Sequence, residues 1–319
     1  MERFKATTSF IQIQLWQDCK NGCKFCSEKQ YYSNKKEDLE FAFKLLNSDE
    51  VLQYDEIGLI GGEFFDDQLD NEEVRKMFYE LCYKITNMHF KKFYIATSLL
   101  FDIDKHLVPF LKQLEKWKVP QNVLICTSYD TKWRFDGYKT GKPKKSLFRK
   151  NMRILHEEFP DFPTHIEIIL TGDFIDKVLN NEFDIGYFSN YYKSRVDFIE
   201  PTSGLHFKDK YELQKICPNF FPTKTQFVNF IKQECIKKKT VDLRCLISYQ
   251  IRASRVYHKD MGKFVCYEDR RQPDFKQFSL DKDLKVDVGL IDSDESMESI
   301  CTQICEMLPD DLYSNIRFL

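Results

Sequence analysis

The sequence has no long hydrophobic run. Nowhere do about 18 apolar residues follow one another, so we expect no transmembrane helix. Residues 1–16 are interrupted by Gln12 and Gln14, and no small-residue cleavage site follows, which argues against a signal peptide. The 11 cysteines are therefore expected in a reducing cytoplasm, where metal ligation or catalysis is a more common role than disulfide bonding.

A strong net charge is also missing. The 48 Lys and Arg residues nearly balance the 50 Asp and Glu residues, and the formal net charge is −2. This disfavours nucleic acid as a partner, although basic stretches at 139–145 and 232–239 leave that class open. The favoured alternative for these stretches is a lysine-rich loop and helix exposed to solvent. No internal repeat or low-complexity tract is visible. The chain does have 42% hydrophobic and 15% aromatic residues, enough in 319 residues to bury a sizeable core.

Over the first two-thirds of the chain, short apolar runs alternate with amphipathic stretches. The runs predict strands at 10–16, 56–60, 93–97, 123–127, 166–170 and 196–199. The stretches predict helices at 36–46, 72–85, 105–117, 147–158 and 175–179. Such alternation implies parallel βαβ units with right-handed crossovers. We therefore predict an α/β fold, either a partial (β/α)6 TIM-like barrel or an open doubly wound sheet.

Both of these architectures gather ligands at the carboxyl ends of the parallel strands. The functional residues are therefore expected just after Trp16, Ile60, Thr97, Thr127 and Leu170.

The pattern changes after about residue 204. Residues 207–239 are expected to be helical, and 251–257 and 264–267 flank a turn at 258–262, as in a β-hairpin. We predict a boundary near residue 205, which separates a core domain (1–205) from a smaller C-terminal α+β extension (206–319).

Three cysteines directly follow the first predicted strand. Cys19, Cys23 and Cys26 lie within eight residues, and Gly22 lets the backbone turn tightly between them. Iron–sulfur clusters usually bind four thiolates, but no fourth cysteine or histidine lies nearby. A centre with three protein ligands keeps one metal position open, as a reactive site requires and a structural zinc site does not. A zinc site with a distant fourth ligand remains an alternative.

The C-x3-C-x2-C spacing, with Phe25 before the last cysteine, resembles the signature of the radical S-adenosylmethionine (SAM) superfamily. The resemblance implies a [4Fe–4S] cluster on Cys19, Cys23 and Cys26, with SAM chelating the fourth iron through its amino and carboxylate groups. One electron would cleave SAM to methionine and a 5′-deoxyadenosyl radical, which abstracts hydrogen from the substrate. By analogy, a flavodoxin- or ferredoxin-type protein would supply the electron.

Further segments resemble SAM-binding parts of this superfamily. Gly61, Gly62 and Glu63 follow the second strand and are similar to its GGE motif, which binds the SAM amino group. Ser98 ends the third strand, and its hydroxyl could bond a ribose or an amino-acid carboxylate. Weaker likenesses indicate cofactor contacts near the ends of the fourth and fifth strands, at Ser128, Asp130, Arg134, Ile168 and Gly172. For the polar residues among these, the alternative is a local hydrogen bond within a turn.

A second group of cysteines lies near the C-terminus. Cys245 and Cys266 flank the predicted hairpin, while Cys301 and Cys305 lie one helical turn apart. Together they could bind a second [4Fe–4S] cluster or zinc, or they could be buried free cysteines. Their arrangement resembles the shortened "twitch" form of the SPASM extension in radical SAM peptide-modifying and sulfatase-maturing enzymes.

The twitch resemblance favours a peptide or protein side chain as the substrate, although a small molecule is also open. Two alternatives remain. One is radical modification of a nucleotide or RNA, and the other is a non-enzymatic iron–sulfur or zinc protein.

Overall fold

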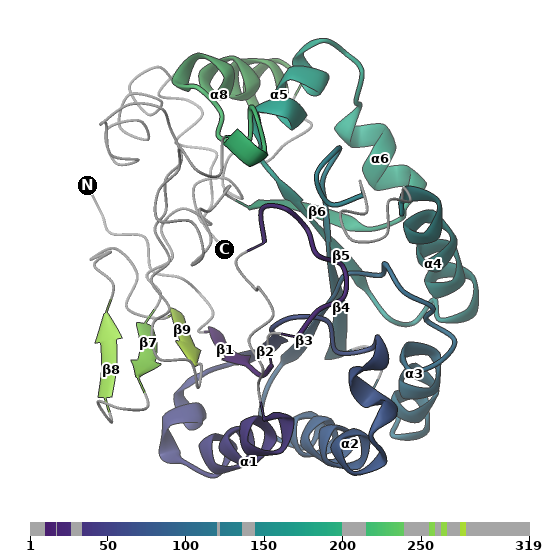
Figure 1. Ribbon diagram of the computed structural model, residues 1–319, viewed down its shortest axis with the longest axis vertical. Helices are drawn as coiled ribbons and strands as arrows, with labels where there is room; N and C mark the ends of the chain where they lie inside the picture. Colours follow the sequence, from purple (N-terminus) through teal and green to yellow (C-terminus); the bar gives the residue numbers. More distant parts are fainter. Residues whose placement is uncertain are drawn as a thin grey trace.

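A single mixed sheet organises the protein (Figure 1). The computed structural model describes residues 10–16, 18–26, 34–119, 122–135, 144–199, 215–238, 255–258, 263–266 and 275–278. Nine strands within these ranges follow the order β6-β5-β4-β3-β2-β1-β9-β7-β8. They are β1 (Phe10–Gln14), β2 (Glu56–Ile60), β3 (Lys92–Thr97), β4 (Val123–Tyr129), β5 (Thr164–Ile169), β6 (Arg195–Ile199), β7 (Arg255–His258), β8 (Lys263–Cys266) and β9 (Phe275–Phe278).

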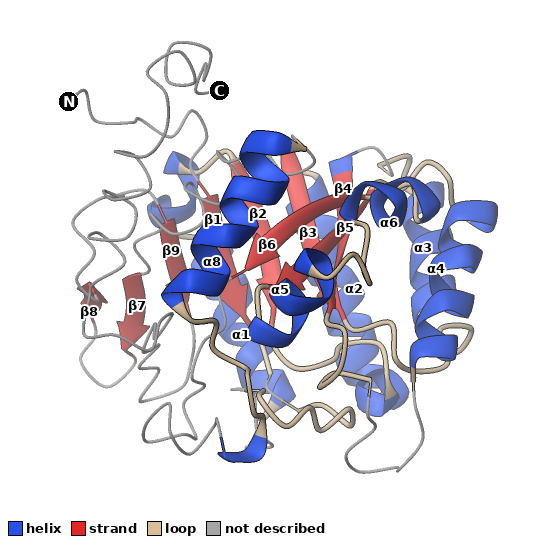
Figure 2. Ribbon diagram, turned by 90° about the horizontal axis from the view of Figure 1, so that it is seen from above, coloured by secondary structure: helices blue, strands red, loops and turns tan. Residues whose placement is uncertain are grey.

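Helices connect the parallel strands and lie around the outside of the sheet (Figures 1 and 2). They are α1 (Lys35–Leu46), α2 (Glu72–Thr86), α3 (Leu107–Lys116), α4 (Lys145–Glu158), α5 (Gly172–Leu179), α6 (Ile185–Tyr191) and α8 (Lys224–Phe230). Helix α8 continues as a π-helix, η4 (Ile231–Lys237), and two short 3-10 helices are η1 (Asp49–Gln53) and η2 (Asp67–Asp70). None of the helices that the structure describes is long and apolar enough to cross a membrane.

The strand order decides between the two predicted architectures. Strands β1 to β6 are parallel, and each pairs with the next one along the chain. A doubly wound sheet would reverse its strand order at a switch point, and this sheet does not. The outer edge of β1 pairs with β9 and not with β6, so the six strands curve without closing. The predicted partial (β/α)6 barrel is confirmed.

The main core lies between the sheet and the surrounding helices. In strand β3, Phe93 and Ile95 are buried on one face, whereas Tyr94 on the opposite face is half-buried. Phe78 of helix α2 belongs to the same apolar cluster as Phe93 and Ile95. Each fully buried side chain of this size contributes about 1.5–3 kcal/mol through removal of apolar surface from water. Asn71 caps α2 by accepting hydrogen bonds from the backbone of its first turn.

Part of the C-terminal region packs directly against the barrel. Phe227, Phe230 and Ile231 of α8 and η4 belong to the same apolar cluster as the sheet. Strands β7 and β8 form the predicted antiparallel hairpin. Strand β9, which the periodicity did not reveal, pairs with β1. The helix predicted over 207–239 is observed at Lys224–Lys237, while residues 201–214 lie outside the described ranges. The domain boundary near residue 205 stays a prediction.

Candidate active site

The cysteine loop, defined here as residues 18–26, follows β1, whose last residue is Gln14. Two backbone hydrogen bonds join the Gly61–Glu63 segment after β2 to this loop and to Trp16, which precedes it. The Gly62 N–H donates to the Trp16 carbonyl at 2.8 Å, and the Glu63 N–H donates to the Asp18 carbonyl at 3.0 Å. The parallel pairing of β1 and β2 thus continues beyond both strands. It brings the two motifs singled out in the sequence side by side.

Gly61 is required by this close approach. Its φ of +151° lies where side chains are rarely tolerated, and a Cβ at this position would lie 2.3 Å from the Trp16 carbonyl oxygen. Gly22 has a φ of +61° and makes the turn inside the cysteine loop. Both glycines are therefore needed for the backbone conformation at the site.

Glu63 is the buried acid of the site, with 0% of its surface exposed. Its carboxylate accepts hydrogen bonds from the Thr97 hydroxyl at 3.0 Å and from the backbone N–H of Ser98 at 2.5 Å and Phe65 at 3.1 Å. Burial raises the pKa of Glu63 to about 7, although these hydrogen bonds oppose the shift. A ligand amino group that donates to this carboxylate would favour its charged form.

The raised pKa of Glu63 predicts a pH dependence of stability in the absence of SAM. The folded state binds the Glu63 proton more tightly than the unfolded state, whose carboxyl has an ordinary pKa near 4.5. The stabilisation of the folded state by the protonated Glu63 is therefore fully present below pH 4.5, and it is lost as the pH rises through 7. Glu63→Gln has no such titration. In denaturant unfolding, the wild type should lose about 3 kcal/mol relative to Glu63→Gln between pH 5 and pH 8. Parallel pH profiles would contradict this.

The three cysteines of the loop are half-buried thiols. Burial raises the pKa of Cys19 to about 12 and also raises the pKa of Cys23. Arg134 and Lys144 act as positive charges near Cys23 and oppose its shift. Among the residues that the structure describes, no three potential ligands form a group that could hold a metal ion. Three thiols on one short loop match the donor set of an iron–sulfur site, and bound iron would favour their thiolate forms.

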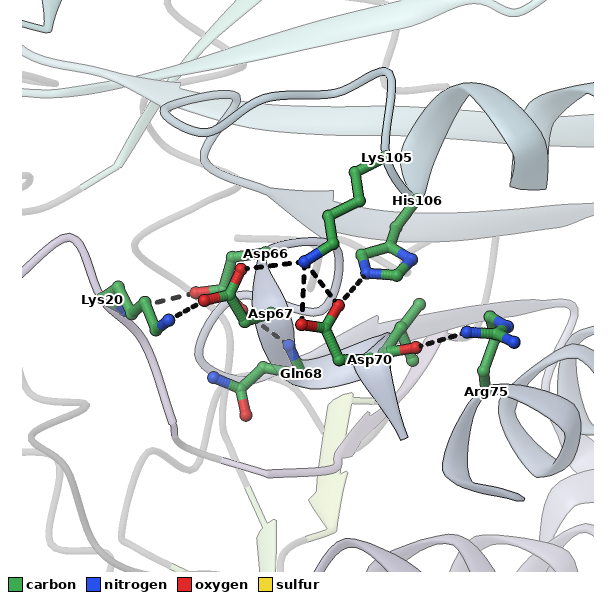
Figure 3. A network of polar contacts seen from close by, with 9 residues as sticks. Lys20, Asp66, Asp67, Gln68, Asp70, Arg75, Lys105 and His106 are labelled. Carbon is green, nitrogen blue, oxygen red and sulfur yellow. Dashed lines mark hydrogen bonds and ion pairs between the residues drawn. The ribbon is translucent and has the colours of Figure 1, made fainter. Parts of the chain in front are cut away.

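A polar network holds one side of the cysteine loop (Figure 3). The Lys20 N–H donates to Asp66 at 3.3 Å, and the Lys20 ammonium contacts Asp67. The network continues from Asp67 to three further side chains in η2 and before α3, which are Asp70, Lys105 and His106. Exposed ion pairs of this kind contribute little individually. As a set they join the loop to the segment that follows Glu63.

The other side of the loop is held by aromatic packing. Phe25 stacks on Phe220 with ring centroids 5.2 Å apart and an interplanar angle of 29°. Phe220 belongs to a small apolar cluster with Trp133, Ile169, Cys217 and Phe221. The Gly172 N–H donates to the Phe220 carbonyl at 3.2 Å, which joins this cluster to the start of α5. A segment beyond the predicted core domain therefore supports the cysteine loop.

Phe220→Ala should weaken retention of a bound cluster. The substitution removes the ring on which Phe25 stacks, and such a pair contributes about 0.5–1.5 kcal/mol beyond the burial of its area. Phe227→Ala is the matched control, because Phe227 is equally buried but lies in the main core. Both variants should lose about 3–5 kcal/mol of stability. Only Phe220→Ala should release iron to a chelator about fivefold faster. Equal rates in the two variants would contradict a role of Phe220 in the site.

Asp130 and Ile168, two residues expected to contact SAM, make contacts within the protein itself. Asp130 has 0% of its surface exposed, and its carboxylate accepts from the backbone N–H groups of Lys132, Trp133 and Arg134. This is the local turn bonding that the sequence left as the alternative. Burial raises the pKa of Asp130, while the three N–H donors oppose that shift. Ile168 is fully buried in the main core.

The remaining predicted site residues are Ser128, Gly172 and the C-terminal cysteines. Ser128 is half-buried in β4 beside Glu167 of β5. Gly172 begins α5, where a Cβ would lie 2.3 Å from the Asn219 side chain. A contact of Ser128, Asp130 or Ile168 with SAM stays a prediction. Cys266 ends β8, but its side chain lies outside the described part, as do Cys245, Cys301 and Cys305.

Comparison with known proteins gives matches among solved structures alone. No family model and no curated protein matches the chain. The structure of anSMEcpe with bound AdoMet has 16% identity and a TM-score of 0.49, covering 76% of this chain and 60% of that chain. The complex of anSMEcpe with AdoMet and the Cp18Cys peptide has 17% identity, a TM-score of 0.49, and covers 75% and 61%. Streptococcus suis SuiB bound to S-adenosylmethionine has 14% identity, a TM-score of 0.44, and covers 70% and 48%.

Both of these proteins are radical SAM enzymes, the superfamily that the Cys19–Cys26 motif resembles. The chain spans about 60% of the length of the first of these structures. At TM-scores below 0.5 the likeness carries no argument about activity. The function proposed below therefore rests on the residues of this chain.

Proposed function

We propose that the protein is a radical SAM enzyme that binds a [4Fe–4S] cluster through Cys19, Cys23 and Cys26 and abstracts hydrogen from a substrate. One observation carries the proposal, namely the junction of the cysteine loop with the Gly61–Glu63 segment at the carboxyl ends of β1 and β2. The two motifs are joined by the hydrogen bond from the Glu63 N–H to the Asp18 carbonyl. Parallel α/β folds place their active sites at this edge of the sheet.

Each part of the site has a distinct role in this proposal. When bound, the cluster and SAM would supply a one-electron reduction and a 5′-deoxyadenosyl radical. The three cysteines provide thiolate ligands. Glu63 accepts from the SAM amino group, and the Thr97 hydroxyl and Ser98 N–H orient its carboxylate for that contact. Because Glu63 is fully buried, its interaction with a bound amino group is shielded from water.

A peptide or protein side chain is the substrate class that we propose. It rests on the twitch-like spacing of the C-terminal cysteines. Two of the matched structures hold peptides, anSMEcpe with Cp18Cys and SuiB with precursor peptide SuiA, but their TM-scores of 0.49 and 0.43 add no weight. A flavodoxin- or ferredoxin-type electron donor stays part of the proposal.

The second metal site on Cys245, Cys266, Cys301 and Cys305 also stays a proposal. Because iron–sulfur clusters bind cysteine thiolates, replacing both Cys301 and Cys305 by alanine should lower bound iron from about eight to about four atoms per chain. Unchanged iron would remove this idea.

The direct test of the proposed function is release of 5′-deoxyadenosine. The chain is reconstituted anaerobically with iron and sulfide, reduced with dithionite and given SAM. Product formation that depends on the three cysteines of the loop supports the reaction class. If a chain that holds a reduced [4Fe–4S] cluster gives no product, the protein is a metal-binding protein without radical chemistry.

A further inference from the structure

Lys144 lies beside the cysteine loop, although it belongs to the basic stretch 139–145 that the sequence offered for contact with solvent or nucleic acid. It directly precedes α4, and its backbone N–H donates to the Phe135 carbonyl at 2.9 Å. The Lys144 ammonium donates to the Asn21 side-chain oxygen at 2.6 Å. These two residues are 123 positions apart in the chain. Lys144 therefore faces the candidate active site.

Asn21 connects this ammonium to both halves of the site. It lies between Cys19 and Cys23, and only 7% of its surface is exposed. The Asn21 side-chain amide also donates to the Ser98 hydroxyl at 2.6 Å. The backbone N–H of Ser98 in turn donates to Glu63. A continuous series of hydrogen bonds thus runs from Lys144 through the cysteine loop to the buried acid.

The charge of Lys144 has no ion-pair partner among the residues that the structure describes. Its hydrogen-bond acceptor is a neutral amide oxygen, so the half-buried ammonium is held without an ion pair there. The groups whose negative charge acts on it are Cys23, Cys19 and Asp66, and Arg134 acts on it as a positive charge. The two cysteines are uncharged as thiols but become anionic when they bind metal. An anionic group bound at the loop would therefore complete the charge balance.

We propose that Lys144 is a positioning residue of the cluster site, which holds the cysteine loop through Asn21 and places a fixed positive charge beside the bound cluster. This inference rests on the proposed function, because it needs a cluster on the loop. A nearby positive charge stabilises the reduced cluster more than the oxidised one, since the reduced form carries one more electron. Lys144 therefore raises the reduction potential of the cluster.

The test compares Lys144→Met, which removes the charge, with Lys144→Arg, which keeps it. Lys145→Met is the matched control, because the charges that act on the neighbouring Lys145 are those of Arg149 and Lys177 and not those of the cysteine loop. Each full-length variant is reconstituted anaerobically, its iron is counted, and its cluster is titrated potentiometrically. We expect the ratio of reduced to oxidised cluster at a fixed potential to fall about tenfold in Lys144→Met, or about 59 mV. Lys144→Arg and Lys145→Met should stay close to the wild type.

The outcomes separate this inference from the proposed function. A wild-type chain that assembles no [4Fe–4S] cluster overturns the proposed function itself. A wild-type potential in Lys144→Met, or an equal shift in Lys144→Arg, overturns the role of the Lys144 charge. If Lys144→Met fails to assemble a cluster, Lys144→Gln keeps a donor for Asn21 and is titrated in its place. If Lys144→Gln also fails to assemble a cluster, then cluster assembly in Lys144→Arg supports the inference. If Lys144→Arg assembles no cluster either, the inference is overturned.

Discussion

Replacing Cys23 by alanine is expected to abolish release of 5′-deoxyadenosine from SAM, and so are Cys19→Ala and Cys26→Ala. Each thiolate holds one iron of the proposed cluster, and a loop with two ligands should not assemble it. The loss should therefore be complete and not graded. The measurement is product formation by anaerobically reconstituted chains, with bound iron counted in the same samples.

Cys82→Ala is the matched control for these three substitutions. Cys82 is a buried cysteine in the core face of α2, and its replacement by alanine also removes one sulfur atom. This variant should bind about four atoms of iron in the loop and cleave SAM. Cleavage at the wild-type rate in any of the three loop variants would refute the cluster assignment.

Glu63→Gln should weaken SAM binding by about 10- to 100-fold while the amount of cluster stays the same. The substitution keeps the shape of the side chain and removes the charge that accepts from the SAM amino group. A hydrogen bond to a charged group contributes about 1.5–3 kcal/mol, which sets this range. Equilibrium dialysis of SAM against the reconstituted chain measures the dissociation constant.

Glu73→Gln controls for a general loss of negative charge. Glu73 is exposed in the first turn of α2 and forms an ion pair with Lys36 on α1. Its replacement should leave SAM affinity unchanged. An unchanged dissociation constant in Glu63→Gln would show that this acid does not bind the SAM amino group. Loss of iron in the same variant would assign Glu63 a structural role.

The elements predicted most accurately were those with a strong local pattern. Strand β2 was predicted with its observed bounds, and α1 and α2 each differ from the prediction by one residue. Helices α1 and α2 bury residues at helical spacing, and β2 is a short run that is buried on both faces, so the local pattern identified all three. Helix α6 and strand β9 were missed, because they are short and their partners lie elsewhere in the chain.

The residues of the site fall into the same two groups, those that a local pattern revealed and those that it did not. The three cysteines and the Gly61–Glu63 segment have fixed local spacing, which made them visible in the sequence. Phe220 and Lys144 gave no such signal, because their contacts with Phe25 and Asn21 join positions far apart in the chain. Asp130 did attract attention, but its carboxylate is satisfied by the N–H groups of the turn that follows it.

By itself, the sequence determined the alternation of strands and helices, the three-thiol loop and the motif that follows the second strand, because these depend on residues close together in the chain. Only the tertiary structure decided the winding of the sheet, the burial of Glu63 and the contacts of the cysteine loop with Phe220 and Lys144. These features depend on distances in space, because they arise from pairing between strands, from packing of aromatic rings and from a hydrogen bond of a lysine to a distant residue. Those distances are set when the whole sheet and its helices assemble.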